Sequence, residues 1–113
     1  MMSSRSKSDV LRGTLDLMIL KALDAMGPLH GYAIARRIEQ ISGQQLAINQ
    51  GTIYPALVKL SGRKWIATRW GQSATGRRVK FYAITAKGQN HLRAEEEDWR
   101  RAAGIVARFF KLS

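Results

Sequence analysis

Hydrogen-bonding side chains are concentrated in the short segment 49–54, which reads Asn-Gln-Gly-Thr-Ile-Tyr. Asn and Gln can pair with an adenine edge, and Thr can meet a thymine methyl group. Asn49 is a good helix N-cap, and the free N–H groups of a first helical turn suit a phosphate. The segment therefore predicts a helix whose first turn binds nucleic acid. Tyr54 has two interpretations, a DNA contact or a packed ring with its hydroxyl at the surface.

The charge distribution indicates the same kind of partner. The chain has 19 Lys and Arg against 8 Asp and Glu, for a net charge of +11. The stretch between Gln40 and Ala94 holds no acid and nine basic residues, which are Lys59, Arg63, Lys64, Arg69, Arg77, Arg78, Lys80, Lys87 and Arg93. Solvated faces usually mix both signs. An anion-binding surface is therefore favoured over a face kept basic for solubility.

Other classes of function lack the residues they need. The chain has no Cys, and His30 and His91 are far apart with no acid at ligand spacing, so we expect no metal site and no cofactor. No cluster of nucleophile, His and carboxylate is apparent, which argues against an enzyme. The apolar run at 17–20 is far shorter than the roughly 20 residues that a bilayer needs. We expect a cytoplasmic protein that does not bind membranes.

Hydrophobic spacing and turn residues predict four helices and a hairpin. The expected elements are a helix from an Asp9 cap to about Met26, a helix over 31–42, a helix from Asn49 to Gly62, strands over 66–70 and 79–84 around a flexible tip at 71–76, and a helix from a Thr85 cap to about Phe110. Pro55 should make the third helix begin late or bend, because it deletes one backbone hydrogen bond.

The last predicted helix is too long for a domain of this size. Its 25 residues would span about 37 Å. Its inner positions repeat every seven residues, as in a coiled coil, and the first helix carries apolar residues beyond one face. The residues predicted to form a dimer interface are Leu17, Leu20, Leu92, Trp99, Ala103, Val106 and Phe110. The alternative is that this helix folds back over its own core.

The order of elements predicts a mainly α fold with a two-stranded β wing. This is a winged helix-turn-helix followed by a long C-terminal dimerisation helix, divided as a flexible N-terminus at 1–9, a DNA-binding domain at 10–84 and the helix at 85–113. The residues predicted to bind DNA are Tyr32, Asn49, Gln50, Gly51, Thr52, Tyr54, Lys59, Arg63, Lys64, Arg77, Arg78 and Lys80. For Tyr32, core packing is an equally good interpretation.

Four segments, at 11–16 (LRGTLD), 27–34 (GPLHGYAI), 51–57 (GTIYPAL) and 76–88 (GRRVKFYAITAKG), resemble the PadR family of bacterial transcriptional regulators. The similarity covers about residues 10–100. It implies a homodimer, mostly a repressor, that binds an inverted repeat in double-stranded DNA through winged helices and is joined by a single C-terminal helix. Some members release DNA when a small aromatic molecule binds. The resemblance makes Trp99 a candidate ligand residue, against the simpler role of filling the dimer seam.

The chain departs from the family pattern at both ends of the third helix. Asn49-Gln50 replaces the usual Ser-Pro, and Ser61-Gly62-Arg63-Lys64 replaces an acidic run that usually ends in Gly. Lys64 should then adopt a strained positive φ, unless Gly62 shifts the turn. Bases in place of acids predict tighter and less selective DNA binding. The alternative to a regulator is a winged-helix module that binds RNA or a protein partner without effector control.

Overall fold

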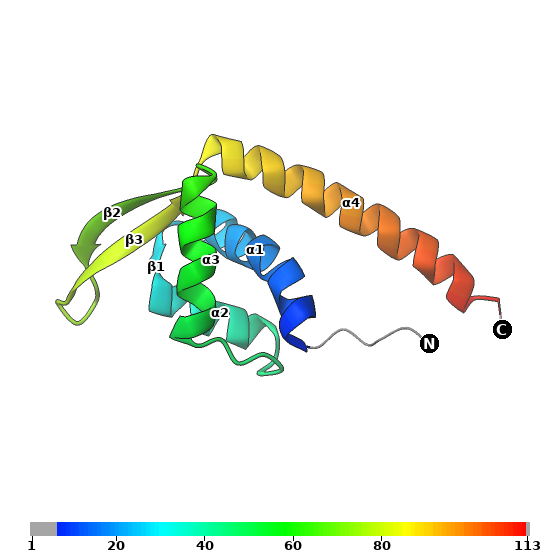
Figure 1. The fold of residues 1–113 in the computed structure, drawn as a ribbon, viewed down its shortest axis with the longest axis horizontal. Helices are drawn as coiled ribbons and strands as arrows, with labels where there is room; N and C mark the ends of the chain where they lie inside the picture. The colour runs from blue at the N-terminus through cyan, green and yellow to red at the C-terminus, as the bar shows by residue number, and fades with distance from the viewer. Residues whose placement is uncertain (1–6, 113) are drawn as a thin grey trace.

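The computed structural model describes residues 7–112 as a helical body with a β hairpin on one side and a long helix leaving the other (Figure 1). The molecule measures 56 × 28 × 23 Å. Its elements are α1 (Lys7–Met26), β1 (Leu29–His30), α2 (Gly31–Ile41), α3 (Gln50–Gly62), β2 (Ile66–Gln72), β3 (Arg78–Ile84) and α4 (Ala86–Phe110).

The core lies where α1, α2 and α3 meet, and apolar residues at helical spacing build it. The residues less than 2% exposed are Ile19, Leu20, Leu23, Ile34, Ile53, Leu57, Leu60 and Leu92. Burying such side chains is the main force that holds the three helices together. Leu20 and Leu92 belong to this core, so their prediction as dimer contacts is wrong. Leu17 is half-buried against the same core.

The sheet has three strands in the order β1-β3-β2, one more than the sequence predicted. Strands β2 and β3 pair antiparallel from Ile66↔Ile84 to Gln72↔Arg78. The additional strand β1 pairs Leu29 with Tyr82. Two residues are too few to show an alternating pattern, which is why β1 escaped prediction. The hairpin tip is shorter than expected, since the strands extend to Gln72 and from Arg78.

Two of the predicted helix caps are confirmed and one is wrong. Asn49 Oδ1 accepts a hydrogen bond from the Thr52 N–H at 3.0 Å, and Thr85 Oγ1 accepts one from the Gly88 N–H at 3.0 Å. α1 begins at Lys7, so Asp9 lies inside the helix rather than at its cap; residues 1–6 of the predicted flexible N-terminus lie outside the described residues. α3 begins directly after its cap and continues through Pro55, so the predicted late start is also wrong.

The positive φ predicted for Lys64 is confirmed. Its φ is 65°, and Gly62 stays within α3 and does not shift the turn. The Lys64 N–H donates to the Ser61 carbonyl at 3.0 Å and the Trp65 N–H donates to the Leu60 carbonyl at 3.1 Å. These two bonds form a Schellman motif, in which the position of Lys64 favours glycine. A non-glycine residue held there costs roughly 1–2 kcal/mol.

Replacing Lys64→Gly is therefore expected to raise the free energy of unfolding by about 1 kcal/mol, because glycine adopts this φ without strain but loses more chain entropy. Thermal and urea unfolding would measure the change. The matched control is Arg63→Gly, which removes the same charge one residue earlier, where φ is −83°. It should destabilise the fold by roughly 0.5–1 kcal/mol. Equal effects of the two substitutions would contradict strain at Lys64.

Only the first part of α4 packs against the body. Leu92 is buried in the core, and two polar contacts tie the helix to α1: Lys21 Nζ lies 3.1 Å from Glu96 Oε2, and Gln89 Nε2 donates to Asp24 Oδ1 at 3.1 Å. From Glu97 to Leu112 every residue is exposed. The helix therefore does not fold back over its own core, as the alternative reading of its length required. None of the helices described between residues 7 and 112 has the length and apolarity of a membrane span.

Candidate nucleic-acid interface

A concave groove of about 780 Å³ lies between the first turns of α3, the start of α2 and the inner face of the β2–β3 hairpin. The hairpin is the wing of the fold, and its tip points away from α4 (Figure 1). The groove brings together half of the residues that the sequence predicted to bind DNA, namely Tyr32, Gln50, Tyr54, Arg77, Arg78 and Lys80. We call this surface the α3–wing groove.

The first turn of α3 presents its polar groups unequally. Asn49 Oδ1 is occupied within the chain, because it accepts hydrogen bonds from the Thr52 N–H at 3.0 Å and the Thr52 hydroxyl at 3.1 Å. A bidentate adenine contact needs both the oxygen and the nitrogen of an amide, so Asn49 cannot make one while it caps the helix. Gln50 is exposed and lines the groove. Gln50 is therefore the better placed of the two to contact a base edge.

Aromatic side chains form the floor of the α3–wing groove. Tyr54 is 38% exposed, and its ring packs over Gly31, where a Cβ atom would lie 2.9 Å from the Tyr54 hydroxyl oxygen. One edge of Tyr54 is thus packed while its side chain lines the groove, and its role as a DNA contact stays a prediction. Burial raises the pKa of the Tyr82 phenol, and the Tyr54 hydroxyl raises it further. Tyr82 therefore stays neutral beneath the groove.

Tyr32 stands at the edge of the same groove. It is 65% exposed, so its alternative reading as a core residue is wrong. Its ring is stacked with the His30 ring, with 6.4 Å between the centroids and 14° between the planes. His30 is the N-cap of α2, and its Nδ1 accepts a hydrogen bond from the Ala33 N–H at 3.4 Å. The phenol of Tyr32 is thus held beside a helix N-terminus, where a phosphate is favoured.

Trp70 is the groove residue that the sequence reading missed. It is 56% exposed on β2, with the Arg78 guanidinium carbon 4.6 Å and Lys80 Nζ 5.5 Å from its ring centroid. Trp70 pairs with Lys80 across the strands, and residues two apart on a strand share a face. The alternation of β2 was the available signal. Each such contact contributes about 0.5–1 kcal/mol and holds a wing cation toward the groove.

We expect Trp70→Leu to weaken binding to duplex DNA by roughly 5- to 30-fold, because the two cations would lose an orienting contact of about 0.5–1 kcal/mol each. Titration of a labelled duplex would measure the loss. Combining Trp70→Leu with Arg78→Ala should cost less than the sum of the two single changes, since both remove the same contact. Strict additivity would contradict the orienting role of Trp70.

Three predicted DNA contacts lie elsewhere. Lys59 Nζ is 2.6 Å from Asp16 Oδ2, so an acid of α1 neutralises it. Arg63 lies 5.2 Å from the centroid of the Trp65 ring. Arg63 and Lys64 follow the C-terminal end of α3, about 20 Å from its first turn. The Lys64 carbonyl accepts a hydrogen bond at 2.8 Å from the hydroxyl of Thr85, the N-cap of α4. Lys59, Arg63 and Lys64 therefore lie outside the α3–wing groove. The predicted gain in DNA affinity from Arg63 and Lys64 is not supported by their position at the far end of α3.

Comparison with known proteins places this geometry in a family. The model of the transcriptional regulator PadR-like family matches residues 19–94, which is more than half of the chain. The chain belongs to the PadR-like family. The sequence-based assignment is thereby confirmed, as is the mainly α winged-helix fold class.

Solved structures of transcriptional regulators share most of this fold. A transcriptional regulator from Clostridium thermocellum is 28% identical, with a TM-score of 0.78 over 89% of this chain and 97% of its own. A PadR-like transcription factor from Bacteroides fragilis is 26% identical, with a TM-score of 0.75 over 91% and 96%. A PadR family regulator from Clostridium difficile is 27% identical, with a TM-score of 0.74 over 87% and 99%.

Proposed function

We propose that this PadR-like chain is a homodimeric repressor that binds an inverted repeat in double-stranded DNA. The observation that carries the proposal is the α3–wing groove, where the exposed first turn of α3 faces wing cations across a concave surface. In helix-turn-helix proteins that first turn enters the major groove. Arg77, Arg78 and Lys80 would then contact phosphates or the minor groove beside it.

The homodimer is supported by the exposed part of α4. Apolar side chains on this part are between 48% and 80% exposed, and they are Trp99, Ile105, Val106, Phe109 and Phe110; Leu112, just beyond the helix, is 74% exposed. So many exposed apolar residues on one helix indicate a surface that another chain covers. We assign the seam to Trp99, Ala103, Val106 and Phe110, all exposed in a single chain. Leu17, which is half-buried on α1, stays a proposed contact at the edge of this seam.

Selection of bound duplexes from a random DNA pool tests this function most broadly. The proposal predicts an enriched inverted repeat whose half-sites are centred about one helical turn apart, roughly 34 Å. Affinity should fall steeply with salt, because bound phosphates release counterions. A pool without symmetric enrichment would argue against the operator model. Preference for single-stranded RNA over duplex DNA would favour the alternative function as an RNA-binding module.

A small aromatic effector is part of the proposal and rests on Trp99. This side chain is 52% exposed on α4, within the proposed seam. In a symmetric dimer two copies of Trp99 could enclose a flat ligand. Titration of a planar cationic dye should quench Trp fluorescence in the wild type and not in Trp99→Ala. The same quenching in both proteins would place the dye elsewhere, because Trp65 and Trp70 remain in the variant.

A further inference from the structure

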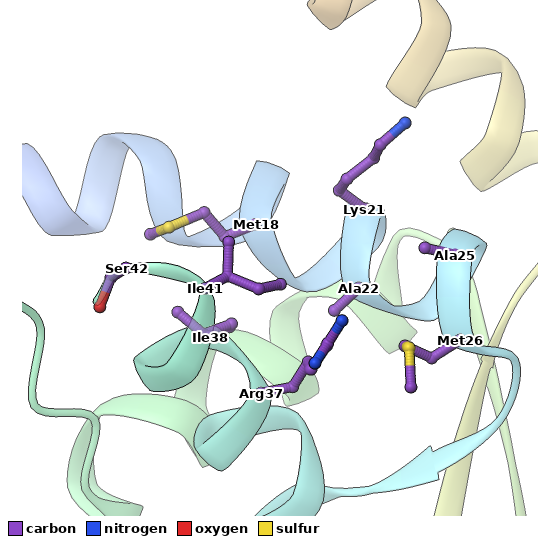
Figure 2. Close-up of a pocket in the computed structure, with 9 residues that line it drawn as sticks. All are labelled: Met18, Lys21, Ala22, Ala25, Met26, Arg37, Ile38, Ile41 and Ser42. Carbon is purple, nitrogen blue, oxygen red and sulfur yellow. The ribbon is translucent and has the colours of Figure 1, made fainter. Parts of the chain in front are cut away.

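Helices α1 and α2 enclose a second cavity, of about 370 Å³, that shares no residue with the α3–wing groove (Figure 2). Its wall is almost wholly aliphatic and includes Met18, Ala22, Met26, Ile38 and Ile41. Met26 is 49% and Ile41 66% exposed, so the mouth of this cavity presents apolar side chains to water. We call it the α1–α2 pocket.

One cation in the α1–α2 pocket lacks a partner. Arg37 Nε is buried and finds no hydrogen-bond acceptor among the residues that the structure describes. Figure 2 shows this guanidinium reaching from α2 toward Ala22 of α1. Buried donors are normally satisfied, and an unsatisfied one is costly. The Arg37 guanidinium thus borders an apolar pocket without a hydrogen-bond or ion-pair partner among the described residues.

The neighbouring cations are already paired, so Arg37 differs from them. Lys21 also lines the pocket, but its Nζ lies 3.1 Å from Glu96 Oε2, and Figure 2 shows it extending away toward α4. Arg36, one residue earlier on α2, donates from Nη1 to Glu39 Oε1 at 2.9 Å. A ligand anion in the pocket would therefore pair with Arg37, whose charge is not already paired.

We propose that the α1–α2 pocket binds a small carboxylate with an aliphatic tail. The carboxylate would accept hydrogen bonds from the two terminal N–H groups of the Arg37 guanidinium, a pairing that suits the planar fork of arginine. The tail would lie among Met18, Met26, Ile38 and Ile41. No aromatic ring lines the pocket, and methionine side chains adapt to a flexible chain. The volume is at the lower end of the roughly 300–1,000 Å³ usual for small-molecule sites.

A second copy of the chain is a poorer occupant than an anion. The apolar residues that a partner's α4 would offer, Phe109 and Phe110, are flanked by Arg108 and Lys111. Docking that end of α4 would bring two more cations to the unpaired guanidinium of Arg37, and like charges repel most strongly where water is excluded. Charge complementarity therefore favours an acid with an apolar tail.

Octanoate and 1-octanol are suitable probes, because they share a chain length and differ in charge. The chain has 4 Met, of which Met18 and Met26 line the pocket. In the wild-type protein with methyl-labelled methionine, NMR titration with octanoate should shift both of these signals until saturation. Octanoate should bind about tenfold more tightly than 1-octanol, since a hydrogen bond to a charged group is worth about that ratio or more.

Two substitutions test whether Arg37 holds the carboxylate of the ligand. Arg37→Met should remove the preference for octanoate, whereas Arg36→Met, which loses the same charge from the adjacent residue, should keep it. Equal affinity of the wild type for both probes, or no shift of Met18 and Met26, would overturn the proposal whether or not the variants fold. Shifts that follow protein concentration instead of octanoate would show that a second copy covers the pocket. DNA binding is measured without octanoate, so the proposed function is tested separately.

Discussion

Replacing both wing arginines, Arg77→Ala and Arg78→Ala, should lower the affinity for duplex DNA by about 100-fold. Both residues line the α3–wing groove, and Arg78 is held over Trp70. A hydrogen bond to a charged group contributes about 1.5–3 kcal/mol, so losing two costs at least 3 kcal/mol, or about two orders of magnitude. Fluorescence titration at several salt concentrations would measure it. The slope of log affinity against log salt should become shallower by about 2.

The control for this experiment comes from the same hairpin. Arg69 lies on β2 opposite Phe81, one residue from Trp70 and therefore on the other face of the sheet. It lines a shallow depression with Pro28 and Phe81 and is not part of the groove. Arg69→Ala should weaken DNA binding much less than Arg78→Ala alone. Equal losses would mean that net charge, rather than the groove, sets the affinity.

Introducing a charge into the proposed dimer seam of α4 should lower DNA affinity by a comparable factor, because it should separate the two copies of the chain. Val106 is 48% exposed and makes no part of the buried core. Val106→Asp should convert the proposed dimer to a monomer, because an unpaired carboxylate in an apolar interface is strongly disfavoured. Two linked half-sites gain about 10²- to 10⁴-fold in avidity over one. DNA affinity should therefore fall by at least about 100-fold while the chain stays folded.

Light scattering after size exclusion would report the mass, and circular dichroism the fold. The matched control is Ala94→Asp, which adds the same charge to an exposed position of α4. Ala94 lies two residues from Leu92 in the seven-residue repeat and so faces away from the seam. It should leave both mass and DNA affinity unchanged. A dimer that survives Val106→Asp would contradict the proposed seam.

Much of the fold follows from local rules in the sequence. The caps Asn49 and Thr85 depend on a side-chain oxygen and the N–H three residues later, so both are visible in the sequence. The positive φ of Lys64 follows from its place after the helix end. These features involve residues close in the chain, and here the predictions were mostly right.

Two local predictions failed, at Asp9 and Pro55, but the errors about the dimer seam and the DNA contacts come from contacts between distant residues. The positive charge of the acid-free stretch between Gln40 and Ala94 is partly neutralised in the folded chain, because Asp16 of α1 forms an ion pair with Lys59 of α3. Leu92 has the seven-residue spacing of a seam, yet it lies where α4 still covers the body and is buried there. Periodicity cannot distinguish an apolar face that meets its own core from one that meets a partner.

The polar groups of the site show the same limit. Asn49 is an exception, because the contact that commits its oxygen is local and its capping role was itself predicted. The exposure of Trp70 and the unpaired Arg37 depend on how β2 and β3, or α1 and α2, come together. Residue types were enough to predict nucleic acid as the partner, whereas the identity of the contacting residues depends on tertiary structure.

Directed cleavage of the selected duplex tests the central claim most directly. The natural chain has no Cys, so Gln50→Cys provides a single attachment point for an iron–EDTA cleavage reagent at the first turn of α3. A dimer that reads DNA through the α3–wing groove should give two clusters of cuts, related by the symmetry of the site and separated by about one helical turn or a multiple of it. The same reagent at Arg63→Cys should cut weakly. One cluster alone, or stronger cutting from position 63, would contradict a dimer that reads DNA through the α3–wing groove.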